Sequence, residues 1–169
     1  MTNAEMLIDA YNRIHSIAHR AVSELSENEL AMQIEDGTNS IAWLDWHLSR
    51  VQDDHIAAAM GDEQIWAGPG WHDRSGLPFD AAATGRGHGP EEIAALGAVA
   101  GRFIVEYHDA VHTRSLRYLS NLTDHELERI VDESWDPPVS LGVRLVSVLS
   151  DNLQHAGQAL FVRGVLERR

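Results

Sequence analysis

The chain has 169 residues, with 26 acidic against 13 basic side chains and a formal net charge of −13. All the basic residues are arginine, cysteine is absent, and ten histidines are present. The length predicts one domain, spanning residues 1–169. The lack of cysteine excludes disulfide scaffolds, zinc fingers and a cysteine nucleophile, and the lack of lysine excludes Schiff-base chemistry.

Charge and hydropathy also limit the partners. A net charge of −13 without a basic stripe argues against nucleic-acid binding, because phosphates would be repelled. No apolar run reaches the length of a membrane span, and residues 1–13 lack the basic and apolar regions of a signal peptide. We therefore expect a cytoplasmic protein that binds neither nucleic acid nor a membrane.

Helical periodicity begins near the amino terminus. Thr2 and Glu5 have the spacing of a capping box, and apolar side chains over residues 7–25 recur on one helix face. A second helix is expected to begin after Ser40, which is a good N-cap residue. It is expected to end at Gly61, because glycine readily adopts the left-handed conformation that closes a helix.

Residues 61–90 differ from the rest of the chain. This stretch holds seven glycines and three prolines, together with Trp66, Trp71 and Phe79. Three large aromatic side chains are too many for a flexible linker, so we predict an ordered crossover loop. Loops of this length often carry function.

Two further helices are predicted after the crossover. The third is expected to begin at Pro90, with acidic residues in its first turn, and to continue as one apolar stripe to Tyr118. The fourth follows Pro137 and Pro138, which cannot lie inside a helix, and covers residues 140–166. Four long helices with one long connection predict an all-α four-helix bundle.

Residues 25–30 and 122–127 resemble each other. Each segment has the spacing of a capping box and follows a long helix. The similarity indicates either two related helical hairpins joined by the crossover or the chance recurrence of a common motif.

Candidate metal ligands occur at helical spacing. Asp151 and His155 lie four residues apart on a mostly apolar stripe, so both can reach one ion. His47 lies on the apolar face of the second helix. Together these residues would form a two-histidine, one-carboxylate set, which leaves coordination positions open in catalytic zinc and non-haem iron sites. The alternatives are a buried hydrogen-bonded pair on the fourth helix and a satisfied core histidine at position 47.

Two other histidine pairs also have four-residue spacing. His15 borders an apolar stripe and His19 precedes an arginine, while acidic neighbours of His108 and His112 indicate a partly solvated face. We interpret both pairs as surface or packing residues.

Four histidines remain outside these pairs and the candidate ligand set. His72 and His88 lie in the crossover and could approach the candidate site. His55 and His125 are expected to face solvent.

Three segments of the chain carry a family resemblance. Residues 39–48 read NSIAWLDWHL, residues 151–158 read DNLQHAGQ, and residues 76–80 read GLPFD. These segments resemble the DinB-like superfamily of metal-binding four-helix bundles, which includes the amino-terminal domain of mycothiol-dependent maleylpyruvate isomerase. The resemblance extends over essentially the whole chain.

The resemblance implies an up-down-down-up bundle, a homodimer, and a central divalent metal held by His47, Asp151 and His155. Many members have histidine where this chain has Asp151, but the isomerase branch carries a carboxylate there. Zinc is the metal expected first, with nickel or iron as alternatives.

The better-understood members suggest an S-transferase that uses mycothiol, bacillithiol or glutathione on a small electrophilic substrate. Because this chain has no cysteine, any thiol has to arrive as a cofactor. Arg50 and Arg144 are candidates to bind a carboxylate of that thiol, the alternative being that both are surface arginines. The rival functions are a metal-dependent hydrolase and a non-catalytic protein that binds a metal or a small molecule.

Overall fold

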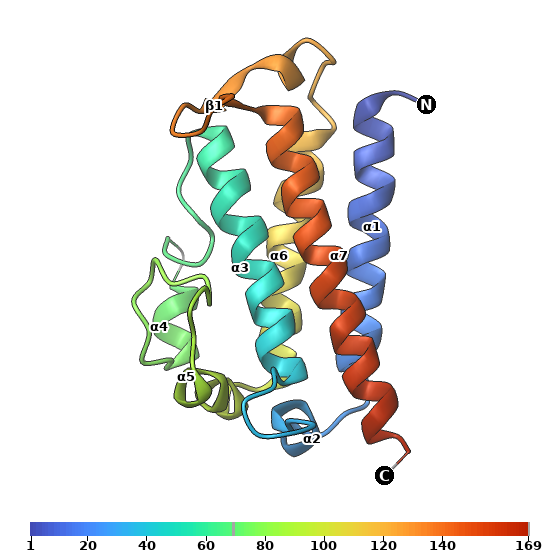
Figure 1. The fold of residues 1–169 in the computed structure, drawn as a ribbon, viewed down its shortest axis with the longest axis vertical. Coiled ribbons are helices and arrows are strands. Elements are labelled where there is room, and N and C mark those ends of the chain that lie inside the picture. The colour runs from blue at the N-terminus through green and yellow to red at the C-terminus, as the bar shows by residue number, and fades with distance from the viewer. Residues whose placement is uncertain (69, 169) are drawn as a thin grey trace.

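Four long helices form the body of the molecule (Figure 1). They are α1 (Asn3–Val22), α3 (Ile41–Met60), α6 (Gly101–Leu119) and α7 (Leu141–Leu166). The computed structural model describes residues 1–68 and 70–168. Helices α1 and α3 each contact both α6 and α7, so the four helices surround a common core. In Figure 1, α1 and α7 run in one direction and α3 and α6 in the other. The prediction of an all-α fold is confirmed.

Shorter elements lie at the ends and along one side of the bundle. They are α2 (Glu27–Ala31), α4 (Trp71–Ser75), α5 (Pro90–Ala95), the 3₁₀ helices η1 (Leu96–Ala98) and η2 (Glu126–Glu128), and the strands β1 (Ile130–Asp132) and β2 (Val139–Ser140). The two strands pair antiparallel, and the sequence analysis did not predict them. They lead directly into α7, whose first residue donates its backbone N–H to the carbonyl of Arg129 at 2.8 Å.

The helix ends follow from local side-chain chemistry. Thr2 and Glu5 form the predicted capping box at the start of α1. The Ser40 hydroxyl accepts from the backbone N–H of Trp43, and Gly61 closes α3 in the left-handed conformation, with φ of 69°. Helix α1 therefore begins, and α3 begins and ends, where the sequence predicts. Helix α1 ends at Val22, whereas the expected apolar stripe continues to residue 25.

The third predicted helix is not continuous, which corrects the sequence-based expectation. Helix α5 continues into η1, which ends at Ala98. The next two residues leave the helical conformation, and α6 begins at Gly101. The break lies against α2, where a Cβ on Gly97 would be 2.8 Å from the Cβ of Ala31 and one on Gly101 would collide with Leu30. The packing of α2 against these glycines therefore accompanies the break, and this tertiary contact is invisible to helical periodicity.

Helix α3 is buried almost all round. Residues 40–50 are all buried, because α6, α7 and the crossover cover different sides of this helix. In the crossover, Trp66 is fully buried and the partly buried Trp71 and Phe79 pack against the core, so the predicted ordered loop is confirmed. Within the described part of the chain, no helix is long and apolar enough to cross a membrane.

Candidate metal centre

The structure brings together the three residues that the sequence analysis proposed as ligands. His47 comes from the middle of α3, and Asp151 and His155 come from the facing side of α7. One potential ligand atom from each residue lies within 4.8 Å of the other two. The His47 and His155 rings meet edge to face, with centroids 4.7 Å apart. One ion can therefore contact a nitrogen from each histidine and a carboxylate oxygen.

Both histidines have one ring nitrogen fixed by an acceptor. The Nδ1–H of His47 donates to the backbone carbonyl of Thr84 at 2.5 Å, and the Nδ1–H of His155 donates to the amide oxygen of Gln158 at 2.9 Å. These bonds place the lone pair of each ring on Nε2, which is how proteins orient metal-binding histidines. Burial lowers the pKa of His47, which favours the neutral ring that a metal requires.

Asp151 completes a donor set that fits a divalent cation. Its Oδ1 lies 3.7 Å from Nε2 of His155, which is too long for a hydrogen bond. Its Oδ2 is buried, and among the described residues it has no hydrogen-bond partner. A buried carboxylate oxygen without a donor is costly unless a cation neutralises it. Two imidazole nitrogens and one carboxylate suit zinc, nickel or iron.

A cavity of about 400 Å³ is lined by two of these ligands, His47 and Asp151. Its walls include Trp43, His55, Asp151 and the loop 84–88. The indole of Trp43 stacks on His47 with centroids 4.6 Å apart, and its Nε1–H donates to Nδ1 of His88 at 3.2 Å. The cavity therefore combines a flat apolar wall with ring nitrogens and the candidate metal ligands.

The crossover approaches His47 at a glycine. Gly85 has φ of 100°, and a Cβ at this position would lie 2.7 Å from Nδ1 of His47. The same Cβ would be 3.1 Å from Trp43 and from Trp46. Only glycine fits this approach without displacing a neighbour, so the loop can place the Thr84 carbonyl directly on the histidine.

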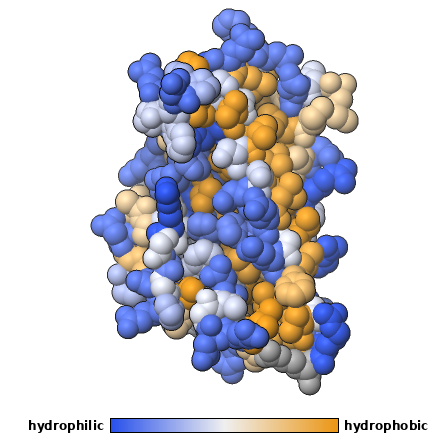
Figure 2. Space-filling view, in the orientation of Figure 1, coloured by the Kyte–Doolittle hydropathy of each residue, from blue (hydrophilic) through white to orange (hydrophobic). Residues whose placement is uncertain are grey.

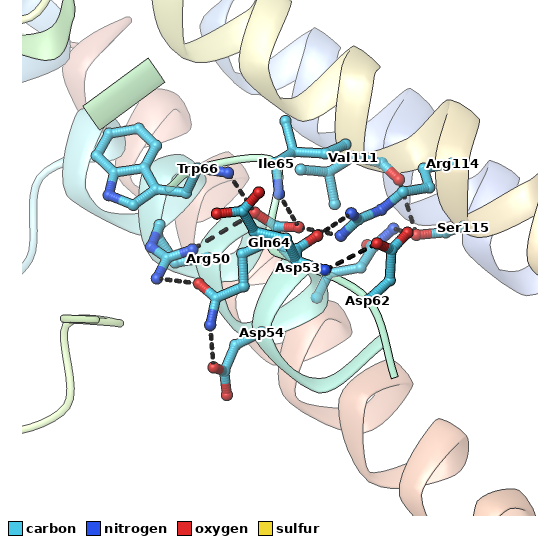
Figure 3. Close-up of polar contacts among 12 residues, drawn as sticks. Arg50, Asp53, Asp54, Asp62, Gln64, Ile65, Trp66, Val111, Arg114 and Ser115 are labelled. Atoms are coloured by element: carbon cyan, nitrogen blue, oxygen red, sulfur yellow. Dashed lines mark hydrogen bonds and ion pairs between the residues drawn. The ribbon is translucent and has the colours of Figure 1, made fainter. Parts of the chain in front are cut away.

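A buried ionic network ties the crossover to α3 (Figure 3). The carboxylate of Asp53 accepts from the backbone N–H groups of Ile65 and Trp66 at 3.0 and 2.8 Å. It also pairs with Arg50, at 3.5 Å, and with Arg114. These contacts fix the beginning of the crossover against the helix that carries His47.

The two arginines proposed for cofactor binding lie in different surroundings. The fully buried guanidinium of Arg50 donates to the carbonyls of Ala81 and Ala83 and to the side chain of Gln64, so it holds the crossover in place. Arg144 contacts His55, which lines the cavity. It pairs with Asp132 at 2.6 Å.

Two residues that the sequence analysis did not propose for the site border the cavity. Arg86 is exposed on the loop, and no ion pair involves it within the described residues. His55, expected to face solvent, is half-buried in the cavity wall and lies 3.3 Å from the guanidinium of Arg144. Burial lowers the pKa of His55, with a further contribution from Arg144. The i+4 and i+8 positions of His47 on α3 give Val51 and His55, so helical spacing offered a signal for this histidine.

The two histidines of the crossover differ in their surroundings. His88 lines the cavity, whereas Nε2 of His72 donates to the carbonyl of Phe79 at 2.8 Å and has a structural role. His125 is exposed, as expected.

His108 and His112 differ from the predicted partly solvated face. Both are buried on α6, because this side of the helix packs against α1. Their acidic neighbours were therefore a misleading signal.

Comparisons with known proteins agree with this architecture. No curated protein matches the chain. The crystal structure of a conserved protein from Enterococcus faecalis is similar, with a TM-score of 0.91, 25% sequence identity, and coverage of 100% of this chain and 99% of that chain. A family model described as the DinB superfamily matches residues 10–159. The chain therefore belongs to the DinB superfamily.

Proposed function

We propose that this protein binds a divalent metal, zinc first, at His47, Asp151 and His155, and that it is a thiol-dependent S-transferase. The observation that carries the metal site is the donor arrangement. Both histidines have Nδ1 occupied and Nε2 available, and Asp151 keeps a buried oxygen without a hydrogen-bond partner among the described residues. A divalent ion bound there would supply a Lewis acid that lowers the pKa of a thiol or water.

The cavity supports a small-molecule substrate. A volume of about 400 Å³ is in the range of ligand pockets. Trp43 offers a flat face for an apolar or unsaturated electrophile. His55 accepts from Arg144 at Nδ1, so its neutral ring carries the proton at Nε2 and can donate a hydrogen bond to a bound molecule.

The thiol has to come from outside the chain, because the sequence has no cysteine. Mycothiol, bacillithiol and glutathione are the candidates. We propose Arg144 and Arg86 as the residues that meet a carboxylate or other polar group of the thiol, since Arg86 lines the cavity and Arg144 contacts His55 in its wall. Arg50 contributes by holding the crossover that carries Arg86.

Turnover of a small electrophile by zinc-loaded protein without a histidine tag tests this proposal. We expect turnover only when one of the three thiols is added. Hydrolysis without a thiol would support the metal-dependent hydrolase instead, and metal binding without turnover would support a non-catalytic binding protein. His47→Ala is expected to lose the equivalent of metal bound at this site. The exposed His125→Ala serves as its control, and full metal content in His47→Ala would show that the site is misplaced.

We also propose that the protein is a homodimer. Exposed apolar side chains follow one side of α7, and Figure 2 shows a hydrophobic band along this helix. Val143, Val146 and Phe161 are 58%, 60% and 66% exposed, respectively. An exposed apolar stripe of this kind is typical of an interaction surface.

A further inference from the structure

A second group of histidines lies on the opposite side of the bundle. Helices α3 and α7 carry the candidate metal centre, whereas His15 and His19 of α1 face Asp109 of α6. His108 and His112 of α6 lie beside them. This cluster was assigned no function by the sequence analysis, and it shares no residue with the first site.

Three of these residues form a compact donor set. Nε2 of His15 and Nε2 of His19 lie 2.7 and 2.6 Å from the same carboxylate oxygen of Asp109. One potential ligand atom from each residue lies within 4.8 Å of the others. The pair on α1 has the four-residue spacing that directs two side chains to one ion. The composition, two histidines and one carboxylate, is the same as at the first site.

The two buried histidines give an independent sign of a ligand. The Ser49 hydroxyl donates to the carbonyl of Asp45 at 2.7 Å, so it accepts from the Nδ1–H of His108 at 2.9 Å. The lone pair of His108 therefore lies on Nε2, which is buried and has no hydrogen-bond partner within the described part of the chain.

His112 shows the same pattern with the ring nitrogens exchanged. Its Nε2–H donates to the amide oxygen of Asn12 at 3.0 Å, which leaves the lone pair on Nδ1. Nδ1 is also buried without a partner among residues 1–68 and 70–168. Metal-binding histidines typically donate their other ring N–H to an oxygen acceptor in this way.

The rings are close enough to act as one cluster. The His15 ring stacks against His112 and His108, with centroids 4.1 and 5.3 Å away.

Burial lowers the pKa of His108 to about 3 and that of His112 to about 4. Both rings are therefore neutral near pH 7, and a neutral ring is the form that binds a metal.

Access to the cluster is from the outside of the bundle. The side chains of His19 and Asp109 are 38% and 46% exposed, whereas the inner face is closed by Ser49 of α3. Solvent therefore reaches the His19 and Asp109 side chains directly.

We propose that His15, His19 and Asp109 form a second binding site for a transition-metal dication of the zinc class. The rings of His108 and His112 lie beside this set, and each keeps one buried nitrogen without a hydrogen-bond partner among the described residues. The ion would join α1 to α6, so its expected effect is structural. This inference does not depend on the proposed transferase activity, because the two sites lie on different helix pairs.

Zinc titration of metal-free protein without a histidine tag tests the proposal. We expect two equivalents of Zn²⁺ bound at micromolar or lower free metal in the wild type. Asp151→Asn and Asp109→Asn are each expected to retain one equivalent, and the double variant none. The exposed His125→Gln is the control for adventitious binding and should keep two equivalents.

Thermal unfolding in the Asp151→Asn background gives a second measurement. Zn²⁺ should raise the unfolding temperature of this variant, and the rise should disappear when Asp109→Asn is added. His19→Gln, at a partly exposed position, replaces Asp109→Asn if that variant fails to fold. One equivalent in the wild type that Asp109→Asn also retains, or a Zn²⁺-dependent rise that persists in the Asp109→Asn and His19→Gln variants, would overturn the proposal in favour of a hydrogen-bonded packing cluster.

Discussion

Gly85 and Gly87 form a matched pair that tests how the crossover holds the candidate metal centre. Both have positive φ, 100° and 81°, so alanine at either position costs on the order of 1–2 kcal/mol of backbone strain. A Cβ at Gly87 meets no atom within 4 Å, whereas a Cβ at Gly85 would lie 2.7 Å from Nδ1 of His47. The two substitutions therefore introduce the same kind of backbone strain, but only Gly85→Ala brings a methyl group against His47.

Gly85→Ala has to displace either the His47 ring or the Thr84 carbonyl. Either movement weakens the hydrogen bond that fixes the lone pair on Nε2. Loss of such an outer partner lowers metal affinity by about 10–100-fold, which corresponds to about 1.4–2.8 kcal/mol. The added methyl group also overpacks the site and lowers the free energy of unfolding by a further 1–3 kcal/mol, roughly. Gly87→Ala should keep the wild-type zinc affinity.

Calorimetric zinc titration in the Asp109→Asn background measures the first site alone, and urea unfolding in chelator measures stability. We expect Gly85→Ala to bind zinc with lower affinity than Gly87→Ala. We also expect its free energy of unfolding to be lower. Equal zinc affinities for the two variants would refute the reasoning, because the contact between the crossover and His47 would then have no part in orienting the ligand.

Four further outcomes are expected. In the Asp109→Asn background, Asp151→Asn should lower zinc affinity by more than about 100-fold in calorimetry, and wild-type affinity would remove this carboxylate from the site. The substitution should not lower metal-free stability, because it replaces a carboxylate whose buried oxygen has no hydrogen-bond partner among the described residues. Asp53→Asn breaks a buried ion pair and should lower the free energy of unfolding in urea by about 3–5 kcal/mol. The partly exposed control Asp54→Asn should lower it by under about 1 kcal/mol. Equal losses would contradict the role of Asp53 in anchoring the crossover. Burial lowers the pKa of His112 from its usual 6.5 to about 4, so the stability that its neutral ring contributes is lost as the pH falls through this window. In chelator, the free energy of unfolding of His112→Gln should therefore fall by up to about 1.4 kcal/mol less per pH unit of acidification than that of the wild type. Parallel pH profiles of the two proteins would argue against the lowered pKa of His112. Phe161→Glu should convert the proposed dimer to a monomer in light scattering, and a monomeric wild type would contradict the dimer.

The sequence predicted those parts of the fold that depend on local chemistry. The capping box of Thr2 and the cap of Ser40 act within one helical turn, so their positions follow from residues three apart. The break before α6 depends on Gly101 packing against Leu30, seventy-one positions earlier in the chain, and no local pattern reveals it. The short hairpin before α7 also escaped prediction, because its strands are only two and three residues long.

The candidate site shows the same division between local and distant information. Helical spacing is sufficient to place Asp151 and His155 on one face of α7. The apolar stripe of α3 is sufficient to turn His47 towards the core. The position of Thr84 on His47 is different, because it depends on a loop that hydrogen bonds to Asp53 and from Arg50 hold in place. Spacing therefore identifies potential ligands, whereas the groups that orient them come from tertiary structure.

The two histidine clusters show why orientation matters more than composition. Each cluster takes two residues four apart from one helix and a third residue from an antiparallel neighbour, and each contains two histidines and one carboxylate. At the first site the crossover supplies an oriented carbonyl and forms a cavity of about 400 Å³, so a small molecule can reach the metal position. At the second site Asn12 and Ser49, which belong to the bundle itself, orient the neighbouring rings of His112 and His108. The same donor set is thus expected to support chemistry on the side that the crossover covers and to join two helices on the other.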